Sequence, residues 1–220
     1  MYKIILFITI TAFVFSCSSA HKSGTGIKNG DSELALYSSG VKKFEKKDYD
    51  IAIEKLEKLL NDYPLSKHSV SAELIIANSH FALKEFLEAV ENYKEFYKLH
   101  PTHEKIPFVI FRIADGYYLQ SPKQIDRDQT NLEYASSYLA ELIKKFPKSE
   151  YTKEANIRMN EIRIKFAKRI QYVGNFYIRK KIYNACVLRF TELKEKYDDL
   201  GFCEEAIYKK GFCLLQLNKK

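Results

Sequence analysis

Apolar side chains along most of this chain recur at intervals of three and four residues, which is the period of one face of an α-helix. Two segments show the pattern clearly, with apolar positions at Ile51, Leu56, Leu59 and Leu60 and at Phe86, Val90, Tyr93 and Phe96. Within each segment, many of the residues between these apolar positions are lysine and glutamate, which suit the solvent-exposed side of a helix. The pattern therefore predicts an all-α protein in which each helix buries one face.

Small residues and prolines recur at fixed intervals and divide the helical pattern into units. A step of twelve residues separates neighbouring marks within the series Gly40, Ala52, Pro64, within Ala77, Ala89, Pro101, and within Ala135, Pro147. Further alanines follow eight residues past the end of a unit, at Ala72, Ala155 and Ala206. A small side chain lets two helices approach closely, and a proline ends a helix because it has no N–H to donate. Each unit is therefore predicted to be a helical hairpin, and stacked hairpins form a solenoid.

Two departures lengthen the later units. A loop is predicted within residues 117–131, where Pro122 breaks one helix and Asp128 is placed to cap the next. Residues 150–179 contain no proline, and no glycine before Gly174, so they predict one long helix that joins the third and fourth units. The serines Ser66 and Ser149 follow the unit-ending prolines and can each cap the helix that comes after them.

The predicted solenoid contains about four and a half hairpins. We expect residues 32–105 to form the first two repeats and residues 106–220 to form the third to fifth, the fifth with a single helix.

The first 31 residues have a different character. Ile4 to Ser16 is an apolar run of about thirteen residues, whereas a membrane-spanning helix needs about twenty. Residues 1–16 therefore read as a signal peptide, with a plain secretory signal as the alternative to a lipoprotein signal. The sequence Val-Phe-Ser-Cys at 14–17 resembles the bacterial lipobox, which implies that the thiol of Cys17 receives a diacylglycerol. Residues 17–31 are rich in glycine and serine and predict a flexible tether.

The charge balance is basic, with a formal net charge of +8. Lysines are scattered among glutamates, as in KKFEKKD and EKLEKLL, without one block of like charge. This pattern favours solvated helix faces and argues against a nucleic-acid partner. A mildly basic surface close to an anionic membrane or an acidic partner is the functional alternative.

Three further cysteines, Cys186, Cys203 and Cys213, follow the predicted lipidation site. Cys203 and Cys213 are ten residues apart on one predicted helix, a span of about 15 Å that a disulfide cannot bridge. A disulfide from Cys186 to either of them stays open. Three small buried thiols are the favoured prediction.

Residue types for catalysis or metal binding are not gathered in this sequence. His100 and His103 flank a helix-ending proline without further metal ligands nearby, so they predict a loop pair and no metal site. The only glycine cluster, GTGIKNG, follows no predicted strand and does not form a phosphate-binding loop. No nucleophile stands in a catalytic motif. We expect neither a cofactor nor an enzyme activity.

The spacing of small and aromatic residues resembles the tetratricopeptide repeat, whose ideal period is 34 residues. The order of lipobox, tether, two regular repeats, an Asp126-Arg127-Asp128 loop and a long helix resembles the BamD family from Cys17 to about residue 217. BamD proteins are lipoproteins of the machinery that inserts β-barrels into the bacterial outer membrane. The chain stops at Lys220, where the family usually adds a closing helix.

The resemblance implies a scaffold that is lipid-anchored to the outer membrane and faces the periplasm. Its C-terminal repeats would bind the POTRA domains of the barrel-assembly protein through Arg189 and Tyr177. Its N-terminal repeats would form a groove for unfolded outer membrane protein segments, and other assembly lipoproteins would join. The groove residues predicted are Tyr37, Val41, Leu74, Asn78 and Phe81.

Each of these assignments has a structural alternative. Arg189 would then be a surface arginine paired within its own bundle, and the groove residues would be core residues. Asp126, Arg127 and Asp128 are interpreted as charges that fix the loop and cap the next helix. The competing function is a periplasmic tetratricopeptide lipoprotein that serves cell-wall synthesis, envelope constriction or pilus assembly.

Overall fold

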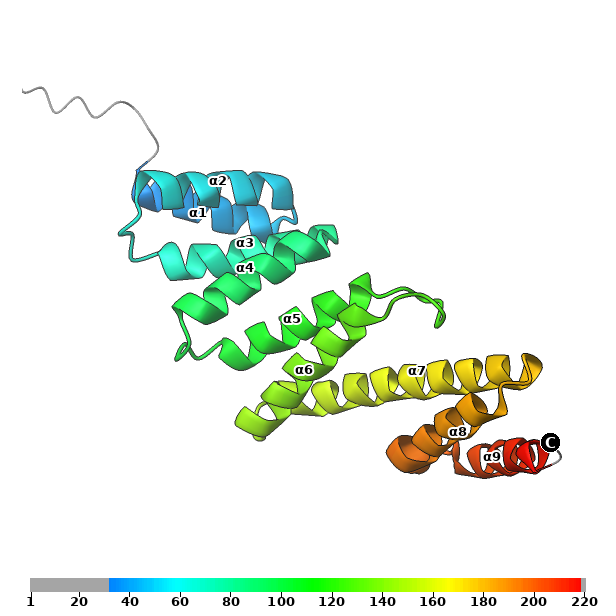
Figure 1. The fold of residues 1–220 in the computed structure, drawn as a ribbon. Helices are drawn as coiled ribbons and strands as arrows, with labels where there is room; N and C mark the ends of the chain where they lie inside the picture. The colour runs from blue at the N-terminus through cyan, green and yellow to red at the C-terminus, as the bar shows by residue number, and fades with distance from the viewer. Residues whose placement is uncertain (1–31, 219–220) are drawn as a thin grey trace, which may run out of the picture. The chain divides into compact units, whose positions relative to one another are not determined.

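The chain folds into nine α-helices and one short 3₁₀ helix within residues 32–218, the part that this computed structural model describes (Figure 1). The α-helices are α1 (Glu33–Glu45), α2 (Tyr49–Asp62), α3 (Ser69–Leu83), α4 (Phe86–Leu99), α5 (Ile106–Gln120), α6 (Thr130–Lys145), α7 (Tyr151–Arg179), α8 (Tyr183–Tyr197) and α9 (Cys203–Leu217). The predicted signal peptide, the predicted lipidation site Cys17 and the predicted tether lie outside the described residues. Within them, no helix has both the length and the apolar character needed to cross a bilayer.

Consecutive helices pack against each other along the chain, so the fold is an all-α tetratricopeptide-type solenoid. The hairpins are α1–α2, α3–α4, α5–α6 and α7–α8, and α9 packs on α8 as the half unit. The long helix predicted after residue 150 is confirmed as α7, which has 29 residues. It contacts both helices of the third hairpin and also α8.

The small residues predicted to let helices approach are buried where helices meet. A Cβ atom built on Gly40 would lie 2.6 Å from the side chain of Leu56 on the partner helix. The alanines are fully buried at Ala52, Ala72, Ala77, Ala89, Ala135, Ala155 and Ala206. Larger side chains at these points would separate the backbones, because packed interiors leave no spare volume.

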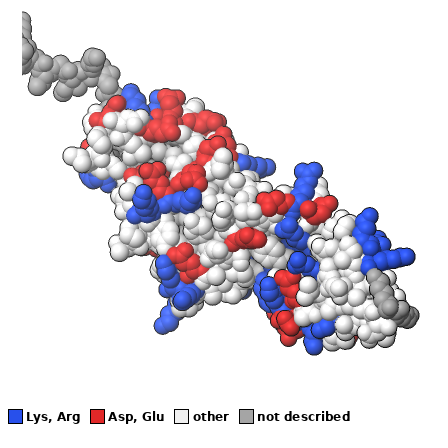
Figure 2. All heavy atoms as spheres, viewed as in Figure 1, with Lys and Arg blue, Asp and Glu red and all other residues white. Residues whose placement is uncertain are grey.

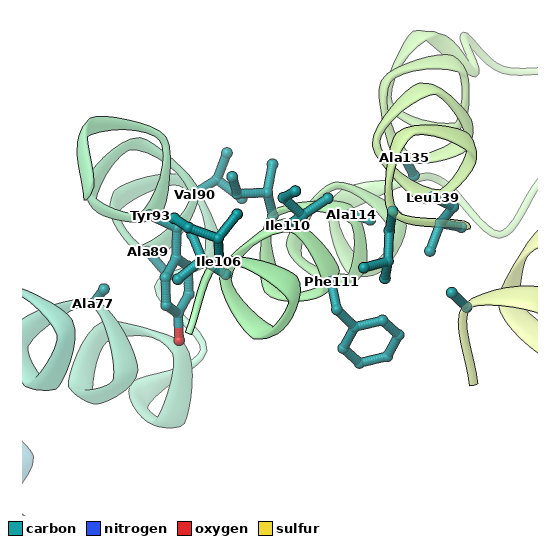
Figure 3. Close-up of a cluster of buried hydrophobic side chains, with 14 of the residues drawn as sticks. Ala77, Ala89, Val90, Tyr93, Ile106, Ile110, Phe111, Ala114, Ala135 and Leu139 are labelled. Atoms are coloured by element: carbon teal, nitrogen blue, oxygen red, sulfur yellow. The ribbon is translucent and has the colours of Figure 1, made fainter. Parts of the chain in front are cut away.

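The main buried cluster runs from α3 to α7. Figure 3 shows its centre, where buried side chains continue from α3 through α4 and α5 to α6, among them Ala77, Tyr93, Ile110 and Ala135. The cluster includes both Phe96 and Ile106, so buried contacts continue across residue 105, the boundary expected between the two halves. A second cluster joins α1, α2 and α3, and a third joins α7, α8 and α9.

Three of the turns between paired helices share one hydrogen-bonding pattern. In each, a lysine adopts a positive φ: Lys47 (64°), Lys84 (66°) and Lys181 (59°). The lysine N–H donates to the carbonyl three residues back, and the next N–H donates to the carbonyl five residues back. This is the Schellman ending of a helix, in which glycine is the usual residue at the left-handed position.

Replacing Lys84 by glycine is expected to raise the free energy of unfolding by about 0.5–1 kcal/mol. Left-handed backbone costs a residue with a Cβ about 1–2 kcal/mol, and the greater freedom of glycine in the unfolded chain offsets part of that gain. Urea unfolding followed by circular dichroism measures the change. The control is Lys168→Gly in the middle of α7, which should cost about 1 kcal/mol. Equal losses at both positions would contradict the argument.

The loop between α5 and α6 is fixed by a different residue from those predicted. The buried Gln129 side chain donates to the carbonyl oxygens of Gln124 and Arg127, at 2.8 and 3.3 Å. The prediction that Asp128 caps α6 is wrong, because the N-cap position is Gln129 and, among the described residues, Asp128 accepts a hydrogen bond only from the Thr130 hydroxyl, at 2.9 Å. Asp126 and Arg127 are exposed and make no ion pair within residues 32–218.

The two serines predicted as caps do bond backbone N–H groups at the start of a helix. Ser66 Oγ accepts from the N–H of His68, the N-cap residue of α3, at 3.0 Å. Ser149 Oγ accepts from the N–H of Tyr151, the first residue of α7, at 3.3 Å.

Cys186 on α8 and Cys213 on α9 form a disulfide, with their Cα atoms 6.3 Å apart. The favoured prediction of three buried free thiols is therefore wrong, and one of the two pairings left open is correct. Cys203 is free and half-buried. The disulfide lies in the third cluster beside Phe190 and joins the last two helices covalently.

Candidate functional site: protein-binding surfaces

The five residues predicted for the peptide groove lie on the first helices of the first two hairpins. Two are one turn apart on α1 and three share one face of α3: Tyr37, Val41, Leu74, Asn78 and Phe81. All five are partly exposed. The structure thus places them on two helices that contact each other, with side chains that contribute to the core and also reach the surface.

Asn78 is held in place by a buried tyrosine. The hydroxyl of Tyr93 donates to Asn78 Oδ1 at 2.6 Å, and Tyr93 itself is fully buried. Burial raises the pKa of Tyr93 strongly, so the hydroxyl stays protonated and remains a donor. The amide nitrogen of Asn78 makes no hydrogen bond within the described residues and is free to donate to a ligand carbonyl.

Phe81 is covered by a cation that sequence reasoning missed. The guanidinium of Arg112 on α5 lies 4.0 Å from the ring centroid of Phe81 and 5.4 Å from that of Phe108. No acidic side chain within residues 32–218 pairs with Arg112, and its Nε is buried without a hydrogen-bond partner. The spacing of Phe108 and Arg112, one helical turn apart in α5, was the available signal.

Further cations lie between α5 and α7. Arg158 pairs with the buried Asp115 at 2.9 Å, and its guanidinium lies 4.2 Å from the ring centroid of Tyr118. Lys165 lies at the same distance from that ring, and burial lowers the pKa of Lys165. The first helices of the third and fourth hairpins, α5 and α7, therefore present arginine and lysine beside aromatic rings.

The two residues predicted to bind a partner lie on α7 and α8. Arg189 is exposed and its guanidinium donates to Glu192 one turn later, at 2.8 Å. Burial raises the pKa of Glu192, but hydrogen bonds from Lys196 and Arg189 outweigh it and leave that pKa below its usual range. Because a guanidinium has five N–H donors, Arg189 retains donors for a second carboxylate. Tyr177 is half-buried against the third cluster.

The two loop histidines have protein partners. His100 Nε2 lies 2.7 Å from a carboxylate oxygen of Glu73, and His103 Nδ1 accepts from the N–H of Lys105 at 3.1 Å. Within residues 32–218 no three histidine, cysteine or acidic side chains are grouped closely enough to hold a metal ion.

Comparison with known proteins gives a match along most of the chain. The sequence model of the family YfiO, described as outer membrane lipoprotein, matches residues 29–216. The outer membrane protein assembly factor BamD of Rickettsia prowazekii is 28% identical over 174 residues, which cover 79% of this chain and 69% of that protein. BamD of Vibrio cholerae is 24% identical over 205 residues, covering 89% and 83%.

Solved structures give a weaker likeness. The Hsp90-bound TPR2AB domain of yeast Sti1 is 13% identical with a TM-score of 0.49, covering 84% of this chain and 70% of that one.

Proposed function

This chain belongs to the BamD family of outer membrane lipoproteins, and from that premise we propose that it is a lipid-anchored scaffold of the β-barrel assembly machinery. Family membership gives the coarse role, an outer membrane protein assembly factor associated with that membrane. The observation that carries the proposal is the family match over residues 29–216, which takes in all nine helices almost to the end of α9.

The anchor and the periplasmic location are parts of the proposal. The lipobox-like residues 14–17 would supply the acyl chains, and two or more chains hold a protein firmly where one holds it marginally. The disulfide between Cys186 and Cys213 supports a site outside the cytoplasm, because disulfides persist in oxidising compartments such as the periplasm.

The C-terminal repeats are proposed to bind the POTRA domains. Arg189 suits this role because its exposed guanidinium can form a bidentate pair with a carboxylate on the partner, in addition to its bond to Glu192. Tyr177 is proposed to support the same surface from α7, where its half-buried ring is held by the third cluster.

The N-terminal repeats are proposed to bind client segments in extended form. Asn78 offers a fixed amide donor for a peptide carbonyl, and Phe81 offers apolar area. Arg112 adds a cation without a carboxylate partner in the described chain, so it can bind a carbonyl or carboxylate group of the client.

A pull-down of POTRA domains with Arg189→Glu tests the scaffold role. Capture is expected to fall at least tenfold, because truncating or reversing one partner of a close charge pair typically costs about 2–5 kcal/mol. Arg189→Lys should give an intermediate loss, since it keeps the charge but not the planar fork. The matched control is Lys194→Glu, an exposed cation on another face of α8, which should leave capture unchanged.

Three outcomes distinguish the parts of the proposal. Undiminished capture by a folded Arg189→Glu variant removes Arg189 from the interface. Failure of the unchanged chain to capture POTRA domains overturns the scaffold role itself. Co-purification from detergent-solubilised outer membranes distinguishes a barrel-assembly scaffold from the competing function, a scaffold for cell-wall synthesis, envelope constriction or pilus assembly. A large barrel protein with POTRA domains should accompany only the barrel-assembly scaffold.

A further inference from the structure

One segment of the chain departs from the scattered charge pattern. Residues 162–191 contain eight lysines and arginines and no aspartate or glutamate. The interpretation that no stretch concentrates charge is therefore wrong for this segment, which runs from the middle of α7 into α8. Arg163 pairs with Asp199 and Arg189 with Glu192, so acidic residues outside the segment neutralise part of it.

Three consecutive cations at the α7–α8 turn have no such partner. Arg179, Lys180 and Lys181 are all exposed and form no ion pair within residues 32–218. Figure 2 shows lysine and arginine side chains gathered at the end of the molecule where Figure 1 places this turn. The positive charge there is open to an external anion.

The other two turns with the same backbone geometry show what is different here. The positive-φ lysine is followed by Asp48 at the α1–α2 turn and by Glu85 at the α3–α4 turn. At the α7–α8 turn it is followed by Ile182, whose side chain is 48% exposed. Two of the three turns thus combine a lysine with an acidic residue, whereas the α7–α8 turn combines cations with an exposed apolar residue.

Exposed aromatic residues continue this surface along α7. Tyr172 and Phe176 lie one helical turn apart and are 42% and 40% exposed. The ammonium of Lys180 lies 5.8 Å from the ring centroid of Phe176, so the rings and the cations share one surface. Aromatic rings beside lysine and arginine are typical of protein surfaces that lie in the lipid headgroup region.

We propose that this basic tip, formed by Tyr172, Phe176, Arg179, Lys180, Lys181 and Ile182, binds the surface of an anionic phospholipid membrane. The cations attract the headgroups, and the exposed apolar side chains enter the boundary between headgroups and acyl chains. The tip is a second membrane contact, separate from Cys17. The proposal rests on the outer membrane association of the family and is independent of POTRA binding.

Flotation with lipid vesicles tests the proposal on the chain from Ser18 to Lys220, which carries the whole folded unit but no acyl anchor. It is expected to float with vesicles of phosphatidylcholine and phosphatidylglycerol, and not with phosphatidylcholine alone. Added salt should release it. The triple variant Arg179→Glu, Lys180→Glu, Lys181→Glu should bind at least about 100-fold more weakly, because the loss of each cation near an anionic surface removes about a fivefold factor and the new carboxylates add repulsion.

The chain offers a matched control with the same change in charge. Lys46→Glu, Lys47→Glu and Lys84→Glu reverse three cations in the other two turns, including two at positive φ, and should keep vesicle binding within a few-fold. Ile182→Asp gives the α7–α8 turn the acidic residue of the α1–α2 turn and should weaken binding about fivefold. Circular dichroism establishes that each variant is folded.

The proposal is overturned if the unchanged chain ignores anionic vesicles, or if the two triple variants bind them equally. Loss of POTRA capture by the tip variant, without any vesicle binding by the unchanged chain, would make the tip a protein interface instead. If the Arg189→Glu variant still binds anionic vesicles, the lipid contact does not depend on POTRA binding and is retained even if the scaffold role fails.

Discussion

The double variant Cys186→Ala, Cys213→Ala is expected to lose about 3.5 kcal/mol of unfolding free energy. The disulfide closes a loop with a sequence separation of 27 residues, and the chain-entropy relation gives that value for such a loop. Both sulfur atoms belong to fully buried residues at the contact of α8 and α9, so the bond holds the last helix on the solenoid. Loss of the bond should therefore free α9 first.

Urea unfolding and amide hydrogen exchange measure this effect. Exchange should accelerate in α9 far more than in α5, whose residues lie in the main cluster. Cys203→Ala is the control, because this thiol is unpaired and should leave the unfolding midpoint unchanged. A reducing agent should destabilise the unchanged chain and have no effect on the double variant. Equal stability with and without the bond would contradict the prediction.

Alanine is expected to have opposite effects at two helical glycines. A Cβ atom on Gly174 would lie 2.7 and 2.8 Å from two ring carbons of Phe190, which is fully buried. Overpacking of this kind costs about 1–3 kcal/mol. A Cβ on Gly211 would meet nothing within 4 Å, so Gly211→Ala should gain about 1 kcal/mol from helix propensity alone. Because both glycines are helical, the propensity gain is common to both variants, and they should differ by the overpacking cost of about 1–3 kcal/mol.

Urea midpoints of the two alanine variants give this difference directly. A second measurement replaces the Phe190 ring by a smaller side chain. Phe190→Leu should reduce the cost of Gly174→Ala when the two substitutions are combined. Similar gains in stability at both glycines would show that Gly174 does not set the distance between α7 and α8.

The helical hairpins could be predicted because their signals are local. Alanines twelve residues apart, such as Ala77 and Ala89, mark the places where paired helices touch, and both are fully buried. Prolines end the second helices, and their absence between residues 150 and 179 gave the length of α7. The pattern did not identify the capping residue of α6 correctly, because Asp128 lies one position before the N-cap, Gln129.

Contacts between residues on different helices could not be predicted from the sequence. Helix rise excluded a Cys203–Cys213 bond, but only the packing of α9 on α8 selects Cys213 as the partner of Cys186. Asn78 was predicted as a residue of the peptide groove, while its bond to the Tyr93 hydroxyl depends on how α3 packs on α4. The run without acidic residues at 162–191 is present in the sequence but was not recognised there, and the α7–α8 turn stood out only by comparison with the other two turns.

The long helix α7 contributes to two separate cores. Ala155 and Ile162 lie in the main cluster, whereas Ala167 lies in the cluster shared with α8 and α9. One residue inserted between Ile162 and Ala167 would turn one face of the helix by about 100° relative to the other and shift it by about 1.5 Å. A change of length in the loop before α6 would disturb only the local hydrogen bonds of Gln129, whereas in this stretch of α7 the spacing is fixed by the packing of both cores.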